Sequence, residues 1–168
     1  MDKRFVLLKH ENKVDFHVDF LLDCGGDRLL TWQFSDKLFA NLLVADENFF
    51  DFTKSPNRIN STVDSNCRRI FDHRRKYLNF SGDLGDHRGY ITRIECGTWE
   101  LLNLSARQLV IKTVGTRLAD NAPVTRLWQF EPPIEIAVDT PVATPDWLMQ
   151  QLPPPGDGNW VVSCSFLC

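Results

Sequence analysis

Short apolar stretches alternate with turn signals along most of the chain, and this pattern limits the fold to antiparallel β-structure. The stretches are too short and too closely spaced for βαβ units, so consecutive strands are expected to pair with one another. The resulting fold class is all-β, either a barrel or a sandwich. The turn signals are Cys24-Gly-Gly-Asp27, Gly82-Asp-Leu-Gly85, Gly97 and Gly115. The expected strands are 4–10, 15–23, 28–35, 67–72, 76–81, 88–96, 98–103, 107–114 and 124–130.

Two segments depart from this pattern. Residues 38–66 begin apolar and turn polar, which predicts a short helix or a functional lid. Eight of the nine prolines follow residue 122, and proline cannot donate to a sheet ladder. We therefore expect a β-domain over 1–130 and a Pro-rich C-terminal extension over 131–168. The aromatic residues of this extension predict that it wraps the domain surface or contacts a partner.

Composition indicates one soluble domain of 168 residues, with 43% hydrophobic and 24% charged residues. The net charge of −3 argues against bulk capture of nucleic acid, although a local basic groove remains possible. No apolar run is long enough for a membrane span, and the first strand follows the N-terminus without a signal peptide. Five cysteines without a CxxC pair favour reduced thiols. We expect a cytoplasmic protein.

A candidate metal site lies in the first two expected strands. His10 ends the first strand, and His17 and Asp19 lie on one face of the second because strand side chains alternate. Phe16, Val18 and Phe20 would occupy the other face. Two imidazoles and a carboxylate with open positions suit a catalytic metal such as Mn, Fe or Zn. The alternative is a polar strand face that includes a chance histidine.

A second candidate site is the basic stretch from Arg68 to Tyr77, which has five cations in ten residues. Arginines at this density suit a phosphate or another anion. His73 could act as a general acid, and the hydroxyl of Tyr77 could stabilise developing charge. The loop Gly85-Asp-His-Arg-Gly89 could bring Arg88 to the same groove. The alternative is a solvated basic turn.

The order of these motifs resembles the 3′-phosphoesterase domain of bacterial DNA ligase D and its small stand-alone relatives. The resemblance spans residues 4 to about 130. The matching residues are Lys9-His10, His17-Val18-Asp19-Phe20, Thr31-Trp32, Asp72-His73-Arg-Arg-Lys-Tyr77, Phe80-Ser81-Gly82 and Gly97-Thr98-Trp99.

The resemblance implies a compact antiparallel β-barrel with the site in a surface groove. It implies a divalent metal, Mn²⁺ or another such as Zn²⁺, held by His10, His17 and Asp19. Catalysis would involve His73 and Tyr77. The expected activity is removal of a 3′-phosphate or 3′-ribonucleotide from DNA or RNA-containing ends in DNA repair. A separate ligase or repair protein is a possible partner.

The chain departs from the family pattern at two positions. Leu21 stands where the ligase form has an arginine, and Lys37 falls one residue later than the family lysine. Because a phosphate site needs a cation, we expect a guanidinium from another strand to compensate and Leu21→Arg to raise activity if none does. The candidates for phosphate binding are Arg69, Arg74, Arg88 and Lys37, with Arg75 as a further source of compensation.

Two other functions use the same residues. A non-haem iron oxygenase would use His17, Asp19 and His73 as a facial triad. A non-catalytic module of the same fold would use the groove to bind a nucleic-acid end or a protein.

Overall fold

The computed structural model describes residues 3–44, 62–137, 147–156 and 158–167. Its elements are β1 (Arg4–Glu11), β2 (Phe16–Asp23), β3 (Arg28–Phe34), α1 (Lys37–Val44), β4 (Thr62–Arg69), β5 (His73–Arg74), a 3-10 helix (Arg75–Leu78), β6 (Gly82–Asp83), β7 (Tyr90–Ser105), β8 (Gln108–Arg117), β9 (Pro123–Glu131), α2 (Trp147–Gln151) and β10 (Asn159–Leu167).

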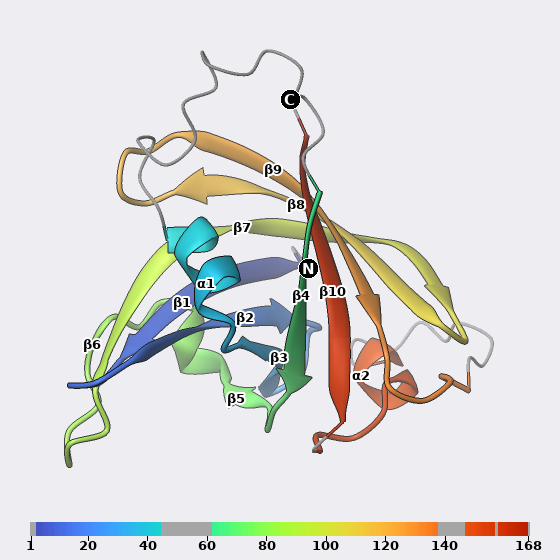
Figure 1. Ribbon diagram of the computed structural model, residues 1–168, viewed down its shortest axis with the longest axis horizontal. Coiled ribbons are helices and arrows are strands. Elements are labelled where there is room, and N and C mark those ends of the chain that lie inside the picture. Colours follow the sequence, from blue (N-terminus) through green and yellow to red (C-terminus); the bar gives the residue numbers. More distant parts are fainter. Residues whose placement is uncertain (1–2, 45–61, 138–146, 157, 168) are drawn as a thin grey trace.

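The strands form a closed antiparallel β-barrel of eight strands (Figure 1). The order around the barrel is β1-β2-β3-β4-β10-β9-β8-β7, and pairing of β7 with β1 closes it. The short strands β5 and β6 are additions, paired with β3 and β7. The expected all-β barrel is therefore confirmed.

Aromatic side chains fill the barrel interior. Phe20, Trp32, Phe34, Trp128 and Phe130 are each 0% exposed, and their rings stack across the barrel. The Trp32 and Phe130 ring centroids, for example, are 4.5 Å apart. Helices α1 and α2 both add apolar side chains to this core, and Figure 1 shows them on either side of the β4–β10 pair. Close packing of large rings makes the barrel interior a solid core rather than a ligand cavity.

A second apolar cluster lies on the outer face of the barrel. Because alternate residues face opposite sides, Phe5 and Leu7 enter the interior while Val6 and Leu8 point outward. The outward residues pack with Leu78 of the 3-10 helix, which crosses this face. Leu21, Leu29 and Ile91 complete the cluster. The chain from β5 to β6 thus covers part of the outer face, next to the expected site.

The first three strands match the expected positions, but the middle of the chain differs. The expected strand at 67–72 is β4, which begins five residues earlier at Thr62. The expected strand at 76–81 is wrong: this segment starts in the 3-10 helix, because Leu78 is drawn onto the outer apolar cluster. The helix expected within 38–66 is α1, whereas residues 45–61 lie outside the described part.

Gly97 and Gly115 do not form turns, although both were expected to. They lie opposite each other within β7 and β8, so the expected strands 88–96 and 98–103 are one strand. A Cβ atom on Gly97 would lie 2.2 Å from the Val114 carbonyl oxygen, and one on Gly115 would lie 2.9 Å from the Phe5 ring. Glycine is required here for close approach of strand and core, rather than for a turn.

The division into a barrel over 1–130 and an extension over 131–168 also needs correction. β10 pairs with both β4 and β9 and is therefore an integral strand of the barrel. Trp160 points into the core and is 2% exposed. The prolines lie before this strand and not within it, so they do not interrupt its ladder.

Candidate metal centre

The β1–β2 hairpin brings the two histidines together. His10 lies directly opposite His17 in the register of the pair, and their ring centroids are 4.7 Å apart. Directly opposed residues share a face of the sheet. Asp19 is two residues beyond His17 and so lies on the same outer face. The alternate residues, Val18 and Phe20, fill the barrel, and this alternation determines which face carries the polar groups.

The three side chains converge on one point. One nitrogen from each histidine and one carboxylate oxygen of Asp19 all lie within 4.8 Å of one another. Asp19 is 1% exposed, and its Oδ1 atom is buried without a hydrogen-bond partner. A buried carboxylate oxygen with no donor is costly. A divalent cation would satisfy it, and the donor set of two imidazoles and one carboxylate suits such an ion.

His73 approaches the same carboxylate from β5. Its Nε2 atom lies 3.7 Å from Asp19 Oδ2, while Nε2 of His17 lies 3.5 Å from Oδ1. The Nδ1 atom of His73 lies 3.2 Å from the carbonyl oxygen of Phe71. Because a carbonyl only accepts, Nδ1 carries the proton in this bond and Nε2 has a free lone pair in the neutral ring. The backbone N–H of His73 donates to Thr31 Oγ1, which fixes β5 against β3.

Tyr77 packs against the ring of His73. The two rings pack edge to face with centroids 5.2 Å apart, and Tyr77 packs in turn against Phe80. Tyr77 is on the 3-10 helix, which the buried Leu78 anchors to the barrel. The structure therefore brings together His10, His17, Asp19, His73 and Tyr77, five of the residues that the sequence singled out.

A tight loop holds His10 in place. Its Nε2 atom lies 2.8 Å from the carbonyl oxygen of Arg88, so the tautomer that donates this bond keeps the lone pair on Nδ1. Such an outer hydrogen bond is what metal-binding histidines ordinarily have. The loop is compact because the N–H of Arg88 donates to the carbonyl oxygen of Gly85, and the N–H of Leu84 donates to the carbonyl oxygen of Gly89.

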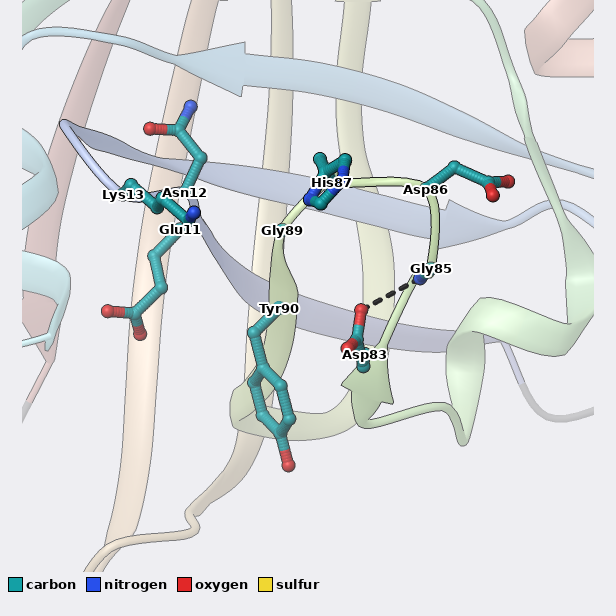
Figure 2. Close-up of a pocket in the computed structure, with 9 residues that line it drawn as sticks. All are labelled: Glu11, Asn12, Lys13, Asp83, Gly85, Asp86, His87, Gly89 and Tyr90. Carbon is teal, nitrogen blue, oxygen red and sulfur yellow. Dashed lines mark hydrogen bonds between the residues drawn. The ribbon is translucent and has the colours of Figure 1, made fainter.

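This loop approaches the β1–β2 hairpin so closely that only glycine fits at residue 89. Gly89 has a φ of +98°, and a Cβ there would lie 2.3 Å from the Glu11 carbonyl oxygen. Asp86 and His87 also adopt the left-handed conformation. Figure 2 shows the open hollow between residues 11–13 and this loop, with His87 among the residues that line it. The hollow lies beside the cluster and not at it.

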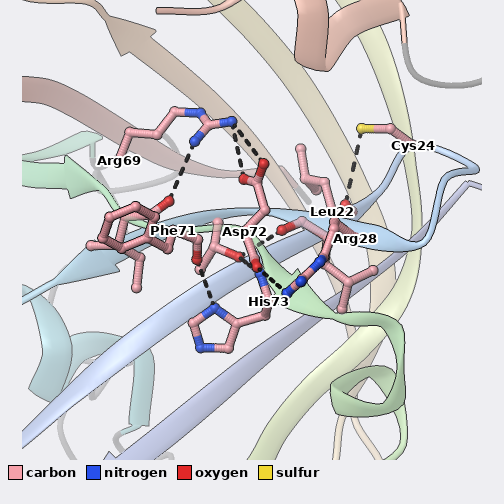
Figure 3. A network of polar contacts seen from close by, with 10 residues as sticks. Leu22, Cys24, Arg28, Arg69, Phe71, Asp72 and His73 are labelled. Carbon is pink, nitrogen blue, oxygen red and sulfur yellow. Dashed lines mark hydrogen bonds and ion pairs between the residues drawn. The ribbon is translucent and has the colours of Figure 1, made fainter. Parts of the chain in front are cut away.

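Arg69 was expected to bind phosphate, but its side chain lies on the face of β4 that is opposite to the cluster. It pairs in register with Trp32 and points into the barrel end, where it is 3% exposed. Its guanidinium contacts the Asp72 carboxylate at 3.0 Å. Burial lowers the pKa of Arg69, and the charge of Asp72 opposes this. Figure 3 shows Asp72 turned toward Arg69, with the His73 ring on the other side of the chain. This ion pair anchors the segment that carries His73, and it does not face the cluster.

The other expected phosphate-binding cations are also directed elsewhere. Arg74 follows His73 in an extended strand and therefore points to the opposite face. Arg88 donates to the Leu84 carbonyl oxygen, so its backbone rather than its guanidinium serves the cluster. Lys37 contacts Asp15 at 3.3 Å. Arg75, the further candidate, forms two short contacts with the buried Asp23 carboxylate.

Leu21 is not an empty place in an anion site. It is 0% exposed and packs in the outer apolar cluster with Val6, Leu8 and Leu78. The structure gives no support to the expectation that Leu21→Arg raises activity, because a guanidinium there would be buried without a partner.

Gln33 was not singled out from the sequence, and Arg68 was included only as a member of the basic Arg68–Tyr77 stretch. Asp19 pairs in register with Gln33, and Gln33 pairs with Arg68, so all three lie in one row on the outer face. Arg68 is exposed and two strands from Asp19, a distance of about 10 Å at the usual strand spacing. Among the cations of the Arg68–Tyr77 stretch, Arg68 is thus the one that the strand register places on the same face as the cluster. Only the pairing of β4 with β3 reveals this.

The cysteines of the described chain take no part in the cluster. Cys24, Cys67, Cys96 and Cys164 are free thiols. Burial raises the pKa of Cys24 to about 12 and that of Cys164 to about 11. The Cys24 and Cys164 thiols therefore remain protonated at neutral pH, and a protonated thiol is a poor nucleophile and metal ligand.

No protein-family model matches the chain, and a search of the curated proteins finds no match. In the part of the chain that the structure describes, no helix is long and apolar enough to span a membrane.

Proposed function

We propose that the protein is a metal-dependent phosphoesterase that acts on the 3′ ends of DNA or RNA-containing strands in DNA repair. The observation that carries the proposal is the convergence of His10, His17 and Asp19 around a buried carboxylate oxygen that lacks a donor. The motif order that resembles the ligase D phosphoesterase domain supports the choice of reaction. A separate ligase or repair protein would take the resulting 3′-hydroxyl end.

In this proposal His10, His17 and Asp19 hold the divalent ion, Mn²⁺ or another such as Zn²⁺. When bound, the ion supplies Lewis-acid activation of the phosphoryl group. His73 contributes by proton transfer: the Phe71 carbonyl holds Nδ1–H, so Nε2 faces the cluster and, in the imidazolium form of the ring, can donate its proton to the leaving oxygen. Tyr77 fixes the His73 ring through its edge-to-face contact. Arg68, on the same face, supplies positive charge for the nucleic-acid strand.

The direct test is release of phosphate from a 3′-phosphorylated oligonucleotide in the presence of Mn²⁺. His73→Ala is expected to lower turnover at least tenfold, about 1.4 kcal/mol of barrier, with metal binding retained. His87→Asn is the matched control, because His87 is exposed on the 83–90 loop and asparagine tolerates its φ of +59°. Unchanged turnover in His73→Ala would remove this residue from the mechanism. No release from any 3′ end by the wild type would favour a non-catalytic binding module.

Two contacts favour a second candidate, a non-haem iron oxygenase. Both His17 and His73 contact the Asp19 carboxylate, which is the residue composition of a facial triad. The two candidates differ at His10. His10→Ala would abolish metal binding in the phosphoesterase site but would spare a triad of His17, Asp19 and His73. Retained Fe²⁺ binding with oxoglutarate consumption in His10→Ala would establish the oxygenase.

A further inference from the structure

Phe71 is an exposed aromatic residue at the edge of the candidate metal centre. Its side chain is 85% exposed, the most of any aromatic in the described chain. Its carbonyl oxygen contacts His73, the residue proposed for proton transfer. Single exposed apolar side chains are common on protein surfaces, so exposure alone assigns no role. The surroundings of Phe71 distinguish it from such residues.

The backbone around Phe71 is fixed at each neighbouring position. The N–H of Ile70 donates to the Thr31 carbonyl oxygen at 3.1 Å. The Asp72 carboxylate forms an ion pair with the buried Arg69, and the backbone carbonyl oxygen of Asp72 accepts a hydrogen bond from Arg28 (Figure 3). These contacts hold the backbone arch that presents the phenyl ring to solvent, so little backbone entropy is lost when a ligand stacks on the ring.

The charge around the arch indicates the chemistry of the ligand. Arg28 and Arg74 are both exposed and lie directly opposite each other in the β3–β5 pair. Like charges in opposed positions are unfavourable in the free protein and favour a bound anion, which here would lie on the face of β5 opposite to His73. An exposed aromatic ring whose own backbone contacts a histidine of the candidate site suits a phosphoester whose organic part is flat. A nucleotide has this composition, since its base can stack and its phosphates can contact guanidinium groups.

We propose that Phe71 is the stacking platform for the base of the terminal nucleotide and makes the site selective for nucleotide-bearing phosphoesters over simple ones. This inference rests on the proposed function, because it takes the metal centre as the place of the terminal phosphate. The base lies one sugar away from that phosphate, and Phe71 lies two residues from His73, a separation of at most about 7 Å along the chain.

The kinetic test compares two 3′-phosphorylated oligonucleotides that differ only in whether the terminal nucleotide has a base. Phe71→Ala is expected to raise KM for the base-bearing end by at least about fivefold, the low end for base–aromatic stacking. KM for the abasic end should show no such rise, and Phe71→Tyr should restore the wild-type KM for the base-bearing end. Ile134→Ser is the control, since Ile134 is 61% exposed but lies beside the β7–β8 turn. Equal effects of Phe71→Ala on both ends, or none on either, would overturn the proposal.

A binding test separates failure of this proposal from failure of the proposed function. Phe71→Trp places an indole on the arch, and its fluorescence is read as the difference from wild type, which has five tryptophans. The base-bearing oligonucleotide should quench this signal, whereas the abasic one should not. If the wild type releases no phosphate but the quench discriminates between the two ends, Phe71 is a stacking platform in a binding module. If neither oligonucleotide quenches the indole, Phe71 has no such role.

Discussion

At the scale of single residues, Asp19 distinguishes a functional site from a structural one. A carboxylate that is 1% exposed, with an oxygen that accepts no hydrogen bond, destabilises a protein unless something binds it. Asp19→Asn is nearly isosteric and removes the charge. We expect the metal-free variant to be at least as stable as the wild type in urea unfolding, while its affinity for Mn²⁺ falls more than about tenfold. A variant that is several kcal/mol less stable with unchanged affinity would make Asp19 a structural residue.

Leu21 gives a second prediction at this scale. Because it is fully buried in the outer cluster, Leu21→Ala should lower the free energy of unfolding by about 2–5 kcal/mol. Leu21→Met, which conserves volume, should cost less than about 1.5 kcal/mol. Leu21→Arg should cost more than the alanine variant and should not raise activity. If the stability of Leu21→Arg matched that of wild type, the side chain would not be buried in solution.

Much of the cluster could be predicted from sequence, for a specific physical reason. The alternation of Phe16, Val18 and Phe20 with His17 and Asp19 determines the polar face without knowledge of the fold. The phase of β4 could not be obtained in this way, because Arg68 and Arg69 are both plausible on a polar strand. The pairing of Trp32 with Arg69 decides the phase of β4. Without this pairing, the sequence prediction placed Arg69 at the site, whereas Arg68 lies on the face of the cluster. Register between distant strands is not encoded in either strand alone.

At the scale of elements, β10 shows where local reasoning fails. The prolines before it suggested an irregular tail, yet the strand itself completes the barrel. Trp160→Ala should therefore lower the free energy of unfolding by about 3–5 kcal/mol. Val161→Ala is the matched control, since Val161 is the next residue on the opposite face and is 41% exposed. Urea unfolding of the two variants measures the difference. A small effect at Trp160 would mean that the barrel closes without β10.

The β1–β2 hairpin was easier to predict than the 70–78 segment. The hairpin is local in sequence, so its turn and alternation suffice. The path of 70–78 depends on the buried Arg69–Asp72 contact and on Leu78 reaching the outer cluster. Neither is visible as a local pattern, and propensity alone favoured a strand where the chain forms a 3-10 helix.

At the scale of the whole molecule, ligands from both β1 and β2 couple metal binding to folding. An ion that binds only the folded chain stabilises it by about 2.7 kcal/mol at one hundred times its dissociation constant. For a chain of this size this corresponds to a rise in Tm of roughly 5–10 °C. The rise should occur with Mn²⁺ in the wild type and in His87→Asn, and it should be absent in His17→Ala. Mg²⁺, which prefers oxygen ligands, should give a smaller shift.

The most direct test of the central claim is a calorimetric titration of the metal-free protein with Mn²⁺. The proposed centre predicts one site per chain, lost in each of His10→Ala, His17→Ala and Asp19→Asn and retained in His87→Asn and His73→Ala. Binding that persists in the first three variants, or no Mn²⁺ or Zn²⁺ binding by the wild type, would contradict the assignment of His10, His17 and Asp19 as a metal centre.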